Sequence, residues 1–199
     1  AEVLGRLAMI EEKGIKYDYL FIPGEDQNEN YKFWYELLKL WGIDKDKIIE
    51  PFGATKHIRA RMLIVPSLID RVTPDLKPNL SSYISKKTID QLRTKLLSHV
   101  TTDLITQKQF GKKIFISRQD AGTRRITNED EVFAHLEKMG FQRYKLSELS
   151  IVEQICLFAN ADKIIGIHGA GLVNLIFANP NAEVIEVFHD LRCAGCDAL

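Results

Sequence analysis

The chain has 199 residues, which is enough for one domain or two small ones. Hydrophobic residues make up 45% and charged residues 27%, so the chain can bury a sizeable core. Lys and Arg together balance Asp and Glu at 27 each, and this neutrality argues against nucleic acid or an anionic membrane surface as a partner. We find no apolar run near the roughly 20 residues that span a bilayer, and no signal peptide at the start.

The first half of the chain alternates helical and strand-like segments. Apolar residues three and four apart predict helices over Glu2–Lys13, Tyr31–Trp41 and Ser82–Val100. Short apolar runs predict strands over Tyr17–Pro23, Lys47–Phe52 and Arg61–Pro66. The polar stretch Thr101–Gly111 then marks a predicted domain boundary.

The second half alternates more regularly. Strands are predicted over Lys112–Ser117, Phe141–Leu146, Lys163–Ile167 and Glu183–Phe188. Helices are predicted between them, over Asn128–Met139, Ile151–Asn160 and Leu172–Ala178. Ser150, three residues before Glu153, fits a capping box for the second of these helices. This alternation predicts an α/β fold with a parallel sheet.

The strongest local feature is a glycine-rich turn between a strand and a helix, His168-Gly169-Ala170-Gly171. In open parallel sheets, ligands bind beyond the carboxyl ends of the strands, at turns of this kind. Glycines let the backbone approach a ligand closely, and the N–H groups at a helix start suit a phosphate. The alternative is a tight turn whose glycines satisfy steric needs alone. The sequence is neither G-x-G-x-x-G nor a Walker loop, which disfavours a dinucleotide or ATP site.

Charged residues follow or occupy two other strands. Arg118 directly follows the predicted strand Lys112–Ser117, and Arg124 and Arg125 precede the next helix. Their guanidinium groups could bind a diphosphate through paired hydrogen bonds, or they could be solvated surface residues. Glu186 lies within an apolar strand, where its carboxylate either faces solvent or accepts hydrogen bonds from a ligand such as a ribose diol.

Together these features resemble glycosyltransferase family 61 over the segment from Lys112 to Phe188. The matching pieces are the strand end Ile116–Arg118, the Arg-x-x-x-Asn motif Arg124–Asn128 followed by Glu129, the pair Glu153–Gln154, the turn His168–Leu172, and the strand ending at Glu186 after Asn179–Pro180. In the first half, Leu4–Leu7 and Leu40–Ile43 resemble two helix ends of the family. The family includes plant xylan-decorating transferases, animal O-linked N-acetylglucosaminyltransferases of the secretory pathway and bacterial capsular-polysaccharide proteins.

The resemblance implies a GT-B architecture of two Rossmann-like halves. Residues 1–105 would form an incomplete acceptor-side half, and residues 106–199 a nucleotide-sugar-binding half that is truncated at its end. The resemblance further implies transfer of a sugar from a nucleotide-diphosphate donor, expected to be UDP-linked, to a hydroxyl of a glycan or protein. Inversion at the anomeric carbon is expected, without an essential metal or other cofactor.

The resemblance also implies roles for individual residues. Arg118, with Arg124 as second choice, would supply positive charge to the leaving diphosphate, and Glu186 would hold the ribose. A general base is needed near the acceptor hydroxyl, for which Asp26 and Glu25 are weak candidates, so the catalytic residue stays unidentified. The full set of expected donor-binding residues is Arg118, Arg124, Asn128, Glu153, Gln154, His168, Gly169, Ala170, Gly171, Leu172, Asn174 and Glu186.

Two other classes of function stay open. One is a non-catalytic fragment that binds a nucleotide or a glycan. The other is a metal or redox module built on His189, Cys193 and Cys196. These three residues are one fewer than the four ligands of a structural zinc site.

The compartment is inferred from the cysteines. Their odd number, with Cys156 in an apolar helix, favours the reducing cytoplasm, with the Golgi or endoplasmic reticulum lumen as the alternative. The chain begins with Ala1 rather than Met, so we interpret it as an excerpt, in which targeting or membrane segments could lie upstream.

Overall fold

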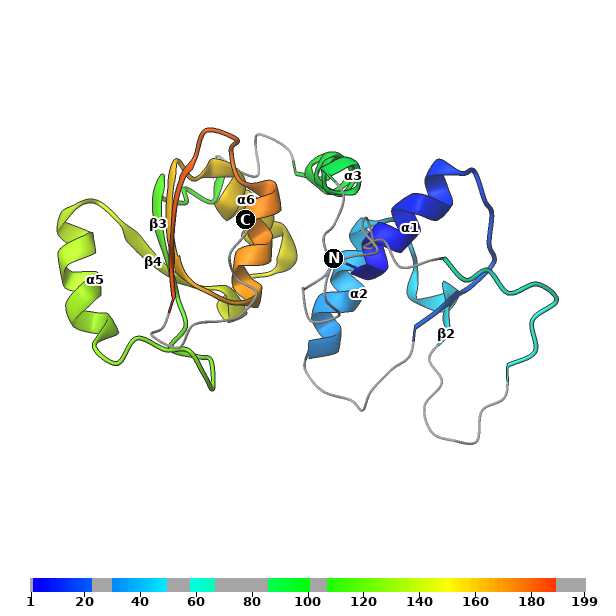
Figure 1. Ribbon diagram of the computed structural model, residues 1–199, viewed down its shortest axis with the longest axis horizontal. Helices are drawn as coiled ribbons and strands as arrows, with labels where there is room; N and C mark the ends of the chain where they lie inside the picture. Colours follow the sequence, from blue (N-terminus) through cyan, green and yellow to red (C-terminus); the bar gives the residue numbers. More distant parts are fainter. Residues whose placement is uncertain (1, 23–29, 50–57, 67–85, 101–106, 189–199) are drawn as a thin grey trace, which may run out of the picture. The chain divides into compact units, whose positions relative to one another are not determined.

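The computed structural model describes residues 2–22, 30–49, 58–66, 86–100 and 107–188 (Figure 1). The chain divides into two compact units, Ala1–Leu96 and Leu97–Leu199. Both units combine helices with parallel strands, so the predicted α/β class is confirmed. Within these described ranges, no helix has the length and apolar character needed to cross a membrane.

The described part of the first unit contains three helices and a pair of very short strands. The helices are α1 (Glu2–Glu12), α2 (Asn30–Leu40) and α3 (Lys86–Leu97). Strand β1 (Leu20–Phe21) pairs in parallel with β2 (Ile48–Ile49), which follows the 3-10 turn η1 (Lys45–Lys47). The helices bury leucines spaced along one face, which are Leu4 and Leu7, then Leu37 and Leu38, then Leu92 and Leu96.

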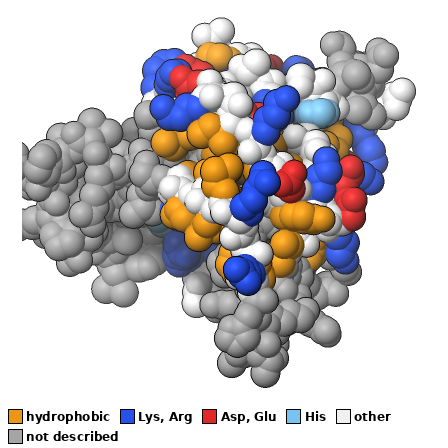
Figure 2. Space-filling view, turned by 90° about the vertical axis from the view of Figure 1, so that its right-hand side faces the viewer, with side chains coloured by type: hydrophobic (Ala, Val, Ile, Leu, Met, Phe, Trp, Pro, Cys, Tyr) orange, Lys and Arg blue, Asp and Glu red, His pale blue; other side chains and the backbone are white. Residues whose placement is uncertain are grey.

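The strand predicted over Arg61–Pro66 is wrong. The segment 58–66 carries no strand, and the side chains of Met62, Leu63 and Val65 are 72 to 75% exposed. A run of apolar residues forms a strand only when another strand accepts and donates the backbone hydrogen bonds. In the described part of this unit, only β1 and β2 pair in this way. Figure 2 shows hydrophobic side chains at the protein surface between charged ones.

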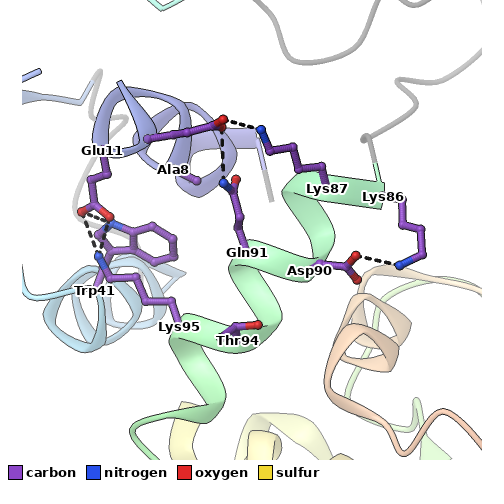
Figure 3. Close-up of a pocket in the computed structure, with 10 residues that line it drawn as sticks. Ala8, Glu11, Trp41, Lys86, Lys87, Asp90, Gln91, Thr94 and Lys95 are labelled. Carbon is purple, nitrogen blue, oxygen red and sulfur yellow. Dashed lines mark hydrogen bonds and ion pairs between the residues drawn. The ribbon is translucent and has the colours of Figure 1, made fainter. Parts of the chain in front are cut away.

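A cavity of about 700 Å³ opens among the three helices of the first unit (Figure 3). Its charged groups are paired with one another: Lys95 with Glu11 at 2.7 Å, Lys87 with Glu12, and Lys86 with Asp90 at 2.7 Å. The Trp41 indole donates to Glu11 Oε1 at 2.9 Å, and the Lys95 ammonium lies 4.1 Å from its ring centroid. These contacts tie the end of α2 to α1 and α3.

The described part of the second unit is a four-stranded parallel sheet with helices on both faces. The strands are β3 (Lys113–Ser117), β4 (Gln142–Lys145), β5 (Lys163–Ile167) and β6 (Glu183–Val187), in the spatial order β4-β3-β5-β6. In Figure 1, α5 (Glu129–Lys138) lies on one side of the sheet, and α6 (Ile151–Asn160) lies on the other. Two 3-10 helices, η2 (Leu146–Glu148) and η3 (Ala170–Phe177), complete this description.

This strand order creates a topological switch point between β3 and β5. From β3 the chain passes through α5 to β4 on one side, and from β5 it passes through η3 to β6 on the other. Because the two connections diverge, the switch point lies beyond the carboxyl ends of β3 and β5. In open α/β sheets this is the place where ligands bind. Arg118 follows β3 and His168 follows β5, so both lie at this edge.

The predicted capping box at the start of α6 is confirmed. Ser150 Oγ accepts from Glu153 N at 3.3 Å, and Glu153 Oε2 accepts from Ser150 N at 2.9 Å. Glu153 also pairs with Lys108 at 2.5 Å. The hydrogen bond from Lys108, followed by those from the Ser150 backbone and hydroxyl, lowers the pKa of Glu153 from 4.5 to about 2.

We expect Ser150→Ala to lower the free energy of unfolding by about 1 kcal/mol at neutral pH. Since the folded pKa of Glu153 lies below its ordinary value, the stabilisation is present above pH 4.5 and is lost as the pH falls toward 2. Urea unfolding between pH 2 and 7 checks this prediction, with Thr123→Ala, at an exposed residue, as control. A native-like pH profile for Glu153→Gln would contradict it.

Candidate functional site

The site is centred on contact between Arg118, after β3, and Gly169, after β5. Strands β3 and β5 pair in parallel, with Ile116 opposite Gly166, so the residues that follow them meet at one edge. A Cβ built on Gly169 would lie 2.2 Å from Arg118 Nη1 and 3.0 Å from Cζ. The guanidinium group therefore occupies the volume that any other residue at position 169 would fill.

The guanidinium group of Arg118 has few partners. Its Nε is buried and has no hydrogen-bond partner among the described residues, and Nη2 donates one long hydrogen bond, 3.5 Å, to the Thr123 carbonyl. Within the described ranges, no carboxylate lies within ion-pairing distance of the Arg118 guanidinium group, although the protein forms several such pairs elsewhere. A buried, unsatisfied donor on a fixed positive charge needs an explanation, and a bound anion supplies one.

The backbone that surrounds the guanidinium group can add dipoles. Gly169 precedes η3, whose first residues Ala170 and Gly171 carry N–H groups that lack an intrahelical acceptor. The helix packs close to the sheet because Gly166 has no side chain: a Cβ there would lie 2.7 Å from Leu172 Cδ2. The structure therefore brings Arg118 together with the predicted turn residues Gly169, Ala170 and Gly171. It places Leu172 in the core beneath them.

His168 and Glu186 form a pair on the β6 side of this edge. His168 Nδ1 lies 2.7 Å from Glu186 Oε1, and the imidazole stacks on Phe188 with ring centroids 4.9 Å apart. From the sequence, both residues are expected to bind the donor, with Glu186 on the ribose. In the structure, Glu186 Oε1 contacts His168 Nδ1 and so orients the imidazole ring.

Three further predicted residues bond mainly to the protein. Gln154 is 8% exposed; its amide donates to the Leu146 and Leu149 carbonyls at 2.9 and 3.1 Å and accepts from Asn174 at 2.9 Å. Glu153 is engaged in the capping box. These contacts connect η2, α6 and η3, so the three residues support the turn from outside the Arg118–Gly169 contact.

Arg124 and Asn128 lie in the loop that enters α5, and both are exposed. Arg124 has a φ of 54°, a conformation uncommon for residues other than glycine. Asn128 donates to Glu131 Oε2 at 3.1 Å. The structure does not bring either side chain into contact with Arg118. The candidates Glu25 and Asp26, and the rival cluster His189, Cys193 and Cys196, lie outside the described residues.

Sequence reasoning missed the importance of Glu129. The sequence places it among three acidic residues in the first turn of α5, but its side chain is 3% exposed and contacts the end of β3. Ser117 Oγ donates to Oε1 at 2.5 Å, and Arg118 N donates to Oε2 at 3.4 Å. Its position directly after the Arg-x-x-x-Asn motif is the one available signal.

The fold and the site define an α/β protein with a doubly wound parallel sheet and an arginine–glycine contact at its switch point. The family model for Glycosyltransferase 61 matches residues 1–185. The chain therefore belongs to glycosyltransferase family 61, as its sequence features indicate.

Several animal proteins named EGF domain-specific O-linked N-acetylglucosamine transferase are similar to parts of the chain. The protein of Drosophila melanogaster is 38% identical over 69 residues, which are 33% of this chain and 13% of that protein. That of Xenopus laevis is 40% identical over 77 residues, 35% of this chain and 15% of that protein. That of Mus musculus is 33% identical over 88 residues, which are 41% of this chain and 17% of that protein. The chain thus spans less than a fifth of the length of these relatives.

Proposed function

We propose that this chain supplies the donor-binding part of a glycosyltransferase that uses a nucleoside-diphosphate sugar, with UDP as the first candidate nucleotide. The acceptor is a hydroxyl of a glycan or a protein. The contact between Arg118 and Gly169 carries this proposal, because it holds against the glycine-rich turn a guanidinium group that pairs with no carboxylate in the part of the chain that the structure describes. Membership of glycosyltransferase family 61 and the similarity to proteins named as sugar transferases support it.

The leaving diphosphate needs charge stabilisation as the glycosidic bond breaks. Arg118 offers two terminal N–H₂ groups and Nε–H, whose fork geometry matches phosphate oxygens. The N–H groups of Ala170 and Gly171 at the start of η3 add dipoles directed at the same region. These groups would supply the charge and dipoles for a mechanism without an essential metal, and inversion at the anomeric carbon follows if the acceptor attacks opposite the diphosphate.

The remaining donor contacts fall on the β6 side. His168, oriented by Glu186, lies next to the turn and can reach a phosphate or sugar oxygen, while Glu186 is also the candidate for the ribose hydroxyls. We further propose that the second unit is the donor half of a GT-B enzyme and that the first unit belongs to its acceptor half. The general base stays unassigned among the described residues.

Thermal unfolding in the presence of nucleotides tests the proposal. UDP, GDP, CDP and NAD are added in turn, with and without EDTA, to the native chain. A ligand present at about 100 times its dissociation constant should stabilise the folded state by about 2.7 kcal/mol. We expect one diphosphate, UDP first, to raise the midpoint whether or not EDTA is present.

Two variants make this test specific. Arg118→Ala should lose the shift, because the main positive group at the turn is gone. Lys138→Ala removes one positive charge in the last turn of α5 and should keep it. If no diphosphate shifts the midpoint of the folded protein, the donor role is wrong; if EDTA abolishes the shift, the metal-independent mechanism is wrong.

A further inference from the structure

Glu129 is a buried carboxylate that fixes the last residues of β3. Its Oε1 accepts from Ser117 Oγ at 2.5 Å and its Oε2 accepts from Arg118 N at 3.4 Å. Ser117 Oγ in turn accepts from Gln119 N at 3.2 Å. One carboxylate therefore organises three successive residues, with Arg118 in the middle.

Burying this charge is costly, so its retention needs a reason. An ionised carboxylate loses favourable hydration on transfer to a protein interior. The cation that pairs with it is Arg143, whose Nη1 lies 3.8 Å from Glu129 Oε1 and makes its shorter contact, 2.5 Å, with the exposed Asp130. Arg143 also lies over the Phe133 ring at 4.6 Å, which restricts its approach to Glu129. The shortest contact of the Glu129 carboxylate is therefore the one with Ser117, at the end of β3.

We propose that Glu129 is a positioning residue for Arg118. By holding the Ser117 hydroxyl and the Arg118 N–H with separate oxygens, it sets the direction in which the chain leaves β3. That direction places the guanidinium group over Gly169. Glu129 does not touch the donor. The effect on nucleotide binding rests on the function proposed above, whereas the effect on Arg118 itself does not.

A double-mutant cycle tests the link between Glu129, Arg118 and binding. Dissociation constants for UDP are measured by calorimetry on the native chain, Glu129→Gln, Arg118→Lys and the double variant. Glutamine keeps the size of the side chain but offers one acceptor oxygen in place of two. We expect Glu129→Gln to weaken UDP binding about threefold to tenfold in the native background, a range typical of coupled neighbours. In the Arg118→Lys background, we expect Glu129→Gln to change binding by less than about twofold, because the guanidinium group that it positions is already gone.

Glu137→Gln is the matched control, since it neutralises an exposed glutamate on the same helix. If Glu129→Gln leaves the dissociation constant unchanged, or weakens binding equally in both backgrounds, the positioning role is wrong. Should Glu129→Gln fail to fold, Ser117→Ala removes the partner hydroxyl instead and is expected to act in the same direction.

A second measurement needs no nucleotide and separates this proposal from the donor assignment. The ¹⁵N–¹H signal of Arg118 Nε, assigned by its loss in Arg118→Lys, reports the environment of this buried group. We expect Glu129→Gln to shift or broaden this signal and Glu137→Gln to leave it unchanged. An unchanged Arg118 signal in Glu129→Gln would overturn the positioning role, even if the native chain binds UDP. A changed signal in a chain that binds no diphosphate would overturn the donor assignment alone.

Discussion

Replacement of Gly169 by alanine is expected to weaken UDP binding about tenfold or more while the protein stays folded. The new Cβ would lie 2.2 Å from Arg118 Nη1, so the guanidinium group has to leave its place over the turn. The displaced atoms are at the far end of a flexible side chain, which can move into solvent at little cost to the fold. The loss of one charge-assisted interaction, worth about 1.5–3 kcal/mol, corresponds to roughly a tenfold to hundredfold change in affinity.

Gly122→Ala is the control for this prediction. A Cβ on Gly122 meets no atom within 4 Å, so this variant should bind UDP as the native chain does. Calorimetry gives the affinities, and urea unfolding shows whether Gly169→Ala keeps its stability within about 1 kcal/mol. In an Arg118→Ala background, Gly169→Ala should have no further effect on binding. Native affinity in the single Gly169→Ala variant would show that the position of Arg118 does not matter to the nucleotide.

The parallel sheet of the second unit could be predicted because its strands are strongly apolar and regularly spaced. Strand β3 and strand β5 lie in the centre of the sheet, where both faces are covered, and their residues Ile114, Phe115 and Ile164 are fully buried. The sequences of strands buried on both faces are continuous hydrophobic runs, which are easy to recognise. The switch point then follows from the order of the strands, and Arg118 and the glycine turn could be placed at it.

The first unit is harder to predict because apolar runs do not say whether a partner strand exists. The sequence predicts longer strands over Tyr17–Pro23 and Lys47–Phe52, but the described ladder pairs only Leu20–Phe21 with Ile48–Ile49. Residues 61–66 have the same apolar character and form no strand in the structure. Pairing is a long-range property, and alternation within a segment carries no information about it.

The side-chain pairs at the site also could not be predicted from the sequence. An acidic residue in the first turn of a helix is usually solvated and favoured by the helix dipole, which describes Asp130 but not its neighbour Glu129. Likewise, nothing in the chain order predicts that Gln154 bonds to Asn174, or that Glu186 pairs with His168. These contacts depend on how η3 and α5 pack on the sheet.

On the proposed function, replacement of Arg118 by alanine is expected to lower turnover about 100-fold to 1,000-fold. This is the range seen when one group that stabilises a developing negative charge is removed. The diphosphate gains charge as the glycosidic bond breaks, so Arg118 should matter more in the transition state than in the bound donor. The loss should therefore fall more on kcat than on the KM for the donor. Steady-state kinetics with varied nucleotide sugar measure both quantities.

Two further variants show which property of Arg118 is responsible. Arg118→Lys keeps a positive charge but loses the planar fork, so an intermediate kcat is expected. Lys138→Ala removes a charge at the far end of α5 and should leave both constants unchanged. If Arg118→Ala instead raises KM and leaves kcat intact, Arg118 binds the ground state and the transition state equally. Stabilisation of the leaving diphosphate would then have to come from the η3 N–H groups and His168, because they are the other donors that the described residues place at this turn.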